Sequence, residues 1–406
     1  KILKNLKNNF LPKEIIVGAK NSDDAAVYTL DKKTSLILTT DFFVPIVDNP
    51  KHFGQIAATN AISDIYAMGG KPIMALSLLG TPTGNISVSV LRKIIDGAGE
   101  ICSKAGIVIA GGHTIELKEP IFGLVVLGSV KNKYLKKNNN AQLGDYLILT
   151  KPIGLGIYAS AIKKKKISKE EYKEFLDTTT QLNDVGTKLS KMKAVSALTD
   201  VTGFGLLGHL TEVCIGSKLS AEIEANKIPI LKSAKKYILS NVLTGASQRN
   251  WNHYRKTIYM KSSDNDFYQR LLSDPQTSGG LIISVKKKKS KEVIKLSEKG
   301  DIPLSWTLLG SGAVPASHDL NMGMMGMHGE FAANNAIQKA DLLIACGMRF
   351  DDRVTGNTKT YSLDSKKIHI EIDPSEINKN VPVDVALVGD LKIVLKKLIP
   401  TINDQQ

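Results

Sequence analysis

The chain has 406 residues, of which 42% are hydrophobic and 23% charged, a composition typical of a globular protein with two or three domains. Its apolar runs are shorter than the roughly 20 residues that a membrane helix needs, and no secretory leader precedes them, so we predict a cytoplasmic protein without membrane spans. The formal charge of +15 raises the alternative of a nucleic-acid-binding protein, but the lysine runs at 163–166 and 286–289 are followed by glutamates at helical spacing, which favours solvated helix faces over specific nucleic-acid binding.

Between residues 25 and 130, short runs rich in β-branched residues alternate with longer segments whose apolar residues recur every three or four positions. The runs AAVYTL, SLILTTDFF, MALSLLG, GIVIAGG and IFGLVVLGSV predict strands. Residues 50–70 and 89–106 predict helices. This order indicates an α/β or α+β domain, and a second α/β unit begins near residue 144.

Acidic residues fall beside or inside these elements. Asp23 and Asp24 precede a strand, Asp41 ends one, and Asp64 lies within a largely apolar helix. Taken singly, each has an ordinary explanation as a turn residue, a cap or a buried hydrogen-bonding group. Taken together they suit Mg²⁺, which is usually held by one or two carboxylates and by substrate phosphates.

A glycine pair could supply a phosphate-binding loop. In AGGHTIELKEP, residues 110–120, Gly111 and Gly112 follow a predicted strand and would let backbone N–H groups approach an anion, with His113 and Thr114 as further donors. The segment is neither a Walker A motif nor G-x-G-x-x-G. A structural turn therefore remains the alternative.

A further acid appears in the second unit. Asp200 ends an apolar stretch, and Gly203, Gly205 and Gly208 follow it before a helical pattern. The spacing predicts a loop that opens a helix beside Asp200, although the glycines could equally serve tight packing.

With these residues in view, the chain from Lys1 to about Pro315 resembles selenophosphate synthetase (selenide, water dikinase). The matching segments, in order, are SDDAAVY, TTDFFVPIVDNP, FGQIAATNAISDIYAMGGKPIMA, AGGHTIE, EPIFGLVVLGSV, LTDVTGFGLLGHL and DPQTSGGLIISV. The resemblance implies the aminoimidazole ribonucleotide synthetase-like fold, with an N-terminal ATP- and Mg²⁺-binding domain at 1–142 that dimerises through its sheet and a second domain at 143–315. It also implies the reaction of ATP, selenide and water to selenophosphate, AMP and phosphate.

The resemblance also implies roles for individual residues. The metal-binding acids would be Asp24, Asp64 and Asp200. The ATP-contacting positions would be Asn21, Ser22, Asp23, Asp41, Asp64, Gly112, His113 and Thr114. Divalent cations held by such carboxylates would bridge the polyphosphate and neutralise charge that develops on the departing phosphoryl group.

In that family, a glycine-rich segment with a reactive Cys or selenocysteine and a catalytic Lys precedes the first helix. Residues 1–10 of this chain resemble that first helix. No residue here matches that pair, so we assign no catalytic residue. If the mature protein begins at Lys1, we expect ATP binding to survive and selenide-dependent turnover to fall. Cys102, Cys214 and Cys346 are far apart without a C-x-x-C pair, so reduced thiols are expected, and Cys102 and Cys214 occupy apolar helical positions typical of buried, inert thiols.

After Pro315 both the charge and the sequence pattern change. From there on, 10 Lys or Arg stand against 12 Asp or Glu. Residues 317–406 resemble part of the central domain of the acetolactate synthase catalytic subunit, with strands DLLIACG, KIHIEID and VALVGD and a closing helix LKIVLKKLIP in a Rossmann-like parallel order. In that family the corresponding positions contact FAD, which here would be Gly326, His328, Gly329, Arg349, Glu371 and Asp373.

The tail lacks the first strands of that domain and any glycine-rich GDG segment, so an appended α/β fragment without activity is favoured over a flavin site. The chain therefore resembles two partial proteins joined near Pro315, and the sequence does not distinguish a natural fusion from an engineered or artefactual one. A flavin-binding fragment, a basic nucleic-acid-binding protein and another ATP-dependent synthetase of the same superfamily remain the alternative functions.

Overall fold

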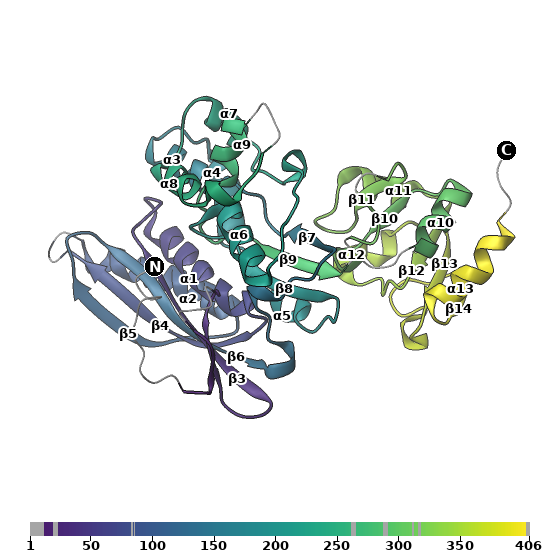
Figure 1. The fold of residues 1–406 in the computed structure, drawn as a ribbon, viewed down its shortest axis with the longest axis horizontal. Helices are drawn as coiled ribbons and strands as arrows, with labels where there is room; N and C mark the ends of the chain where they lie inside the picture. Colours follow the sequence, from purple (N-terminus) through teal and green to yellow (C-terminus); the bar gives the residue numbers. More distant parts are fainter. Residues whose placement is uncertain are drawn as a thin grey trace. The chain divides into compact units, whose positions relative to one another are not determined.

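A computed structural model describes residues 12–18, 23–82, 84, 86–260, 265–286, 291–310, 312–315 and 318–402. The chain forms two compact units, Lys1–Lys286 and Lys287–Gln406. Figure 1 shows helices and strands mixed along the whole chain, which confirms the predicted α/β class. The domain limits 1–142, 143–315 and 317–406 stay predictions.

The first unit opens with a mixed six-stranded sheet. Its strands are β1 (Ile15–Val17), β2 (Ala26–Thr29), β3 (Thr34–Phe43), β4 (Lys71–Thr81), β5 (Ile109–Glu116) and β6 (Ile121–Lys131), in the order β1-β2-β3-β6-β4-β5. Only β4 and β5 pair in parallel within this sheet. Buried and more exposed side chains alternate along β3, so Ile37, Thr39 and Asp41 share one face of the sheet.

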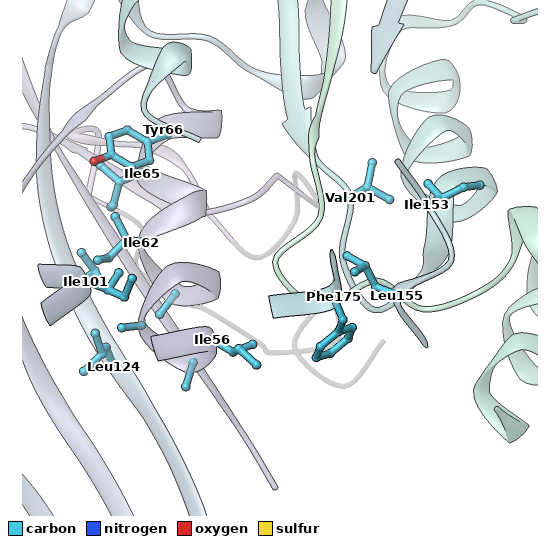
Figure 2. Close-up of a cluster of buried hydrophobic side chains, with 14 of the residues drawn as sticks. Ile56, Ile62, Ile65, Tyr66, Ile101, Leu124, Ile153, Leu155, Phe175 and Val201 are labelled. Carbon is cyan, nitrogen blue, oxygen red and sulfur yellow. The ribbon is translucent and has the colours of Figure 1, made fainter. Parts of the chain in front are cut away.

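Two helices, α1 (Pro50–Ala67) and α2 (Val88–Lys104), pack on the inner face of this sheet. The side chain of Asn49 caps α1, and that of Ser87 caps α2. Every residue from Ile56 to Ala67 is buried, because α1 packs against both the first sheet and the second part of the unit. Figure 2 shows the apolar cluster that results, with Ile62 and other α1 residues beside α2 and β6.

Glycines bring the two helices unusually close. A Cβ atom at Gly54 would lie 1.8 Å from the carbonyl oxygen of Ile94, and one at Gly97 would lie 2.1 Å from that of Lys51. Each glycine thus faces the backbone of the other helix. No larger residue fits at either position without moving the helices apart.

The second part of the first unit is an antiparallel sheet with several helices. Its strands are β7 (Asp145–Leu149), β8 (Val195–Asp200) and β9 (Leu281–Lys286), in the order β7-β9-β8. The helices are α3 (Leu155–Lys163), α4 (Lys169–Thr179), α5 (Val185–Leu189), α6 (Gly205–Ser217), α7 (Ala234–Leu239), α8 (Gly245–Tyr254) and α9 (Asn265–Leu272), with 3-10 turns at Asn132–Tyr134, Asn138–Asn140, Ala225–Lys227 and Arg255–Thr257. Helix α6 begins at Gly205, which confirms the helix predicted after Asp200.

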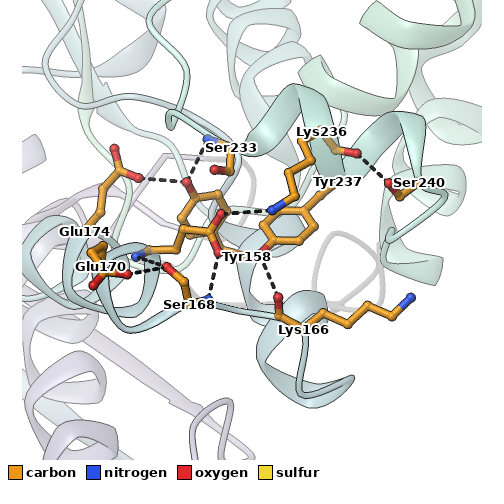
Figure 3. Close-up of polar contacts among 10 residues, drawn as sticks. Tyr158, Lys166, Ser168, Glu170, Glu174, Ser233, Lys236, Tyr237 and Ser240 are labelled. Carbon is orange, nitrogen blue, oxygen red and sulfur yellow. Dashed lines mark hydrogen bonds and ion pairs between the residues drawn. The ribbon is translucent and has the colours of Figure 1, made fainter.

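A polar network joins α3, α4 and the start of α7 (Figure 3). The hydroxyl of Tyr158 donates a hydrogen bond to Glu174 at 2.7 Å and accepts one from the Ser233 amide at 2.9 Å. The hydroxyl of Tyr237 donates to the carbonyl oxygen of Lys166 at 3.1 Å. These tyrosines add specific polar partners to the apolar packing of the helices.

The second unit contains a parallel three-stranded sheet, β12 (Leu342–Cys346), β13 (Lys366–Glu371) and β14 (Val385–Val388), and a parallel pair, β10 (Leu304–Trp306) and β11 (Asn321–Met324). Its helices are α10 (Lys291–Gly300), α11 (Phe331–Lys339), α12 (Asp352–Thr355) and α13 (Leu391–Leu398), with 3-10 turns at Leu308–Gly310, Thr358–Thr360, Pro374–Glu376 and Ile399–Thr401. The predicted parallel strands and closing helix are confirmed.

The three cysteines are free thiols. Cys102 is buried, and burial raises its pKa to about 11. Cys214 is only partly buried, although burial raises its pKa as well, so both thiols are held in the unreactive protonated form.

Within the described residues, none of the helices combines the length and the hydropathy that crossing a bilayer requires.

We expect Gly54→Ala and Gly97→Ala each to lower the free energy of unfolding by about 1–3 kcal/mol, because the added methyl group forces the helix backbones apart. Gly99→Ala is the matched control, since Gly99 lies in the same helix α2 with open space where its Cβ would be. There alanine should be neutral or stabilising by up to about 1 kcal/mol. Urea unfolding followed by circular dichroism measures all three, and equal losses at Gly54 and Gly99 would contradict the proposed close approach.

Candidate active site

Five carboxylates converge in the first unit, where α1, β3, β8 and the segment before β2 meet. They are Asp23, Asp24, Asp41, Asp64 and Asp200. Hydrogen bonds tie two of them to neighbouring elements: Thr39 of β3 donates to Asp64 of α1, and Asn60 of α1 donates to Asp41 of β3. The helix and the strand therefore each donate one hydrogen bond to an acid of the other.

The second part of the unit supplies the remaining contacts. The hydroxyl of Thr199 in β8 donates to Asp24 at 2.6 Å, and that of Ser63 in α1 donates to Asp200 at 2.5 Å. The side chain of Asn183 donates to the Ser63 hydroxyl at 2.8 Å. Asp200, at the end of β8, is thus joined to the helix that carries Asp64.

Because these acids are buried close together, their pKa values are raised. Burial raises the pKa of Asp24 well above its usual value, and the charges of Asp200, Asp23 and Asp64 raise it further. Burial, then the charges of Asp200 and Asp41, raise the pKa of Asp64 in the same way. Burial is the main cause that raises the pKa values of Asp23 and Asp41 to about 6. Such mutual repulsion in a buried site is typical of a functional centre rather than of a structural one.

Two carboxylate oxygens test whether this cluster suits a cation. Oδ2 of Asp23 and Oδ2 of Asp24 are buried and have no hydrogen-bond partner among the described residues. A divalent cation would satisfy both oxygens and offset the repulsion. Within the described part of the chain, no three His, Cys, Asp or Glu side chains already form a ligand set for a metal ion. Mg²⁺ does not require one, because it retains waters and uses substrate phosphates as ligands.

A buried lysine is the residue that sequence reasoning missed. Lys151, just after β7, is 3% exposed, and its Nζ donates to the carbonyl oxygens of Gln181 at 2.6 Å and Ser278 at 2.9 Å. Burial lowers its pKa to about 7, against the opposing effect of Asp200. The segments TKPIG and DPQTSGG stand out in the sequence, but nothing in their spacing indicates that they meet beside Asp200.

The DPQ part of that second segment caps a helix. Oδ2 of Asp274 accepts hydrogen bonds from the amides of Gly156 and Ile157 at 2.9 and 3.1 Å, and Oε1 of Gln276 accepts from the amides of Gly154 and Leu155 at 3.1 and 3.0 Å. The start of α3 thus receives four acceptor contacts from one loop. This arrangement fixes the loop that follows, residues 276–280.

The predicted glycine loop at residues 110–120 is wrong as a loop. Gly111, Gly112, His113 and Thr114 lie inside β5, which is one of the two edge strands of the six-stranded sheet. A Cβ atom at Gly112 would lie 2.1 Å from the hydroxyl oxygen of Ser77. The glycine therefore allows the two strands to pack closely. From the sequence alone, a glycine in this role cannot be told from a glycine in a turn.

The strand register places this segment relative to the acids. Asp41 of β3 lies opposite Leu124 of β6, which lies opposite Ser77 of β4, which in turn lies opposite Gly112 of β5. Three interstrand spacings amount to about 14 Å. Gly112 is therefore in the same row of the sheet as Asp41 but does not contact it. Asn21 and Ser22 lie outside the described residues.

In the second unit, the residues predicted to contact flavin have local roles. Gly326, at φ +104°, and Gly329 form a tight turn closed by a 2.9 Å backbone hydrogen bond. Glu371 accepts from the amide of Ile372 at 2.8 Å, and Asp373 caps the short helix that follows. The two remaining positions, His328 and Arg349, are exposed.

Three known protein families match successive parts of the chain. Residues 22–130 match the AIR synthase related protein, N-terminal domain, and residues 142–309 match its C-terminal domain. These matches confirm the predicted aminoimidazole ribonucleotide synthetase-like fold. Residues 279–398 match the thiamine pyrophosphate enzyme, central domain, in agreement with a partial second protein.

Individual relatives match over most of their length. The chain is 47% identical over 296 residues to a selenide, water dikinase of Dechloromonas aromatica (strain RCB), covering 73% of this chain and 85% of the relative. It is 49% identical over 280 residues to that of Pseudomonas straminea, covering 69% and 78%. It is 46% identical over 287 residues to that of Shewanella sp. (strain MR-4), covering 71% of this chain and 81% of the relative.

Two solved structures share the fold. The protein tt0281 of Thermus thermophilus superposes with a TM-score of 0.52 at 16% identity, covering 73% of this chain and 88% of that one. AaThiL complexed with AMPPCP and TMP superposes with a TM-score of 0.50 at 19% identity, covering 66% and 80%. At these identities the likeness shows the fold alone.

The raised pKa of Asp24 predicts how stability depends on pH. An acid whose folded pKa lies above its unfolded value destabilises the fold once it ionises, so the penalty is absent below the unfolded pKa and grows as pH rises toward the folded pKa. We expect Asp24→Asn to raise the thermal unfolding midpoint of metal-free protein near neutral pH, by roughly 2 °C or more, and to change it little at about pH 4.

Asp96→Asn is the control, because Asp96 is an exposed acid on α2. Differential scanning fluorimetry at the two pH values measures the effect. A neutral-pH midpoint for Asp24→Asn at or below that of the parent protein would show that the carboxylate is not repelled in the fold.

Proposed function

Because this chain belongs to the selenide, water dikinase family, we propose that its first unit converts ATP, selenide and water to selenophosphate, AMP and phosphate. The protein is an ATP-using phosphotransferase. The extended identity to the bacterial relatives carries this conclusion. Five carboxylates converge here, and two of them have buried oxygens without a partner among the described residues, which agrees with chemistry on a polyphosphate.

Asp24, Asp64 and Asp200 would hold Mg²⁺. When bound, the ion would supply positive charge that offsets the negative charge developing during phosphoryl transfer. The protein's own contribution is orientation: Thr199, Thr39 and Ser63 each donate a hydroxyl hydrogen bond to one of these acids. Each of these hydrogen bonds fixes the orientation of one carboxylate.

The nucleotide contacts extend this proposal beyond the carboxylates. Asn21, Ser22, Asp23 and Asp41 would also contact the nucleotide. Gly112, His113 and Thr114 would contact it from β5, whose outer edge pairs with no other strand of the described sheet. An open strand edge offers backbone N–H and C=O groups to a ligand or to a second protomer.

For the second unit we propose an appended α/β fragment related to the central domain of thiamine-dependent enzymes, of the acetolactate synthase kind. Flavin binding stays the less favoured alternative for this unit, and a flavin absorption band in the purified protein would support it. A cytoplasmic location is likewise a proposal.

A homodimer built on the first sheet is also proposed. The outer face of that sheet carries an apolar row in which Leu38 of β3 lies opposite Leu127 of β6, and Leu127 lies opposite Met74 of β4. Leu38 is 50% exposed and Met74 is 37% exposed, and nearby Phe42 is 50% exposed. A contiguous apolar face of this kind is typical of a surface that a partner covers.

Asp64→Asn tests the metal assignment. The amide keeps the size of the side chain and an acceptor for Thr39, but loses the charge that attracts a cation. We expect Mg²⁺-dependent ATP binding, measured by calorimetry, to weaken about tenfold or more, while the protein stays folded. Asp96→Asn should bind like the parent protein, and unchanged affinity in Asp64→Asn would remove Asp64 from the site.

The reaction itself is tested by phosphorus NMR of the protein with Mg²⁺, ATP and selenide. The expected products are selenophosphate, AMP and phosphate. A folded sample that shows no metal-dependent ATP binding in the calorimeter would overturn the proposed function at its first step.

Leu38→Glu tests the dimer surface. A carboxylate in the centre of an apolar interface would be desolvated, so we expect the variant to shift toward monomer in size-exclusion chromatography with light scattering. The control is Leu239→Glu, at a 72% exposed position of α7. A parent protein that is monomeric at micromolar concentrations, or a Leu38→Glu dimer as stable as the parent, would contradict the proposal.

A further inference from the structure

The lysine run at 163–166 lies mainly on a turn. Helix α3 ends at Lys163, and the next three lysines lie in the connection to α4. Lys165 has a positive φ of 52°, and the amide of Lys166 donates to the carbonyl oxygen of Ala161 at 2.9 Å. This backbone closes the helix in a defined conformation. Lys164, Lys165 and Lys166 are therefore not part of the helix face that the sequence predicted for this run.

Two glutamates of α4 turn toward tyrosines instead of toward the lysines of this turn. Glu174 accepts a hydrogen bond from the hydroxyl of Tyr158, and Glu171 accepts one from the hydroxyl of Tyr237. The side chain of Glu171 is only 12% exposed, and it forms an ion pair with Lys236 at 3.6 Å. Both acids thus have partners of their own, so they compensate few of the surrounding lysines.

The start of α7 brings further lysines to the same surface. The hydroxyl of Tyr237 in α7 donates to the carbonyl oxygen of Lys166 at 3.1 Å, which ties α7 to the turn. Figure 3 shows Lys166 and Lys236 on either side of Tyr237. We call the exposed lysines of these segments the basic patch: Lys163, Lys164, Lys165, Lys166, Lys169, Lys173, Lys232, Lys235 and Lys236.

The basic patch carries a large excess of positive charge. Residues 163–174 and 232–237 contain nine lysines against three glutamates. Among the described residues, only Lys236 of these lysines forms an ion pair. Because the turn and α7 are already fixed by hydrogen bonds, little backbone freedom remains to be lost when a partner binds.

The side chains around the patch indicate the chemistry of that partner. Ile162 and Ile167 pack against the core, and in residues 155–180 and 232–240 the one strongly exposed large apolar side chain is Leu239. A membrane surface would require more apolar side chains to insert. The patch also has no arginine, the residue best suited to reading base edges, whereas lysine meets a phosphate as a point charge.

We propose that the basic patch binds the phosphate backbone of duplex nucleic acid without sequence preference. A duplex carries one negative charge per about 1.7 Å of its axis, so several neighbouring lysines can each meet a phosphate at once. This binding is separate from the proposed phosphoryl-transfer function and needs neither ATP nor a metal ion.

The test compares two fourfold variants of the full chain that have the same net charge. The patch variant combines Lys164→Gln, Lys166→Gln, Lys232→Gln and Lys235→Gln, and it leaves Lys236 to pair with Glu171. The control combines Lys32→Gln, Lys33→Gln, Lys191→Gln and Lys193→Gln, which are exposed lysines elsewhere in the first unit. Circular dichroism checks the fold. The double change Lys164→Gln with Lys235→Gln gives half of the effect should the fourfold patch variant unfold.

The probes are two fluorescent 20-base-pair DNA duplexes of unrelated sequence, titrated by anisotropy between 50 and 200 mM KCl. We expect the parent protein to bind both duplexes equally. The patch variant should bind about tenfold or more weakly at 50 mM KCl, and the slope of log affinity against log salt should fall by about 3 to 4, since each lost phosphate contact removes about 0.9. The control should keep most of the parent's affinity and slope.

Several outcomes would overturn the proposal. They are no duplex binding by the parent at 50 mM KCl, equal losses in the patch variant and the control, or a clear preference for one of the two sequences. Polyglutamate that displaces the duplex as well as unlabelled DNA of equal charge would show that any polyanion suffices. Patch-dependent binding to phosphatidylserine vesicles in the absence of duplex binding would assign the surface to a membrane instead.

Discussion

The burial of like charges is the constraint on which the first unit depends. Asp24 and Asp64 have pKa values raised by burial and by the charges of neighbouring acids, and two carboxylate oxygens have no partner among the described residues. A fold does not retain such a cluster for stability, because each buried charge without a partner is unfavourable. The proposed binding of a cation and a polyphosphate would offset this unfavourable burial.

Helix α1 positions several of the side chains that form or contact this acidic cluster. It is buried along its C-terminal two thirds because it packs between the sheet and the second part of the unit, and it presents Asn60, Ser63 and Asp64 to the site within little more than one turn. The close approach of α2 at Gly54 and Gly97 holds the opposite side of the helix. The geometry of the acids thus depends on helix packing at residues remote from them.

Part of this could be predicted from the sequence, and the errors have physical causes. Asp64 stood out because a carboxylate in an apolar helix needs a partner, and α1 and α6 were expected at the positions where they occur. The glycine pair at 111–112 was expected in a loop and lies in β5 instead. Glycine tolerates both a turn and a tight strand contact, and only the approach of Ser77 decides between them.

The sequence by itself determined the α/β class, the helices and strands around the acids, and the family to which the chain belongs, because periodicity and motif order are local properties of the chain. Only the tertiary structure decided which side chains meet. Lys151 and Ser278 are 127 positions apart, and Ser63 and Asp200 are 137 positions apart. Contacts across such separations arise from strand pairing and helix packing, which no local pattern encodes, so the buried lysine becomes visible only in the folded chain.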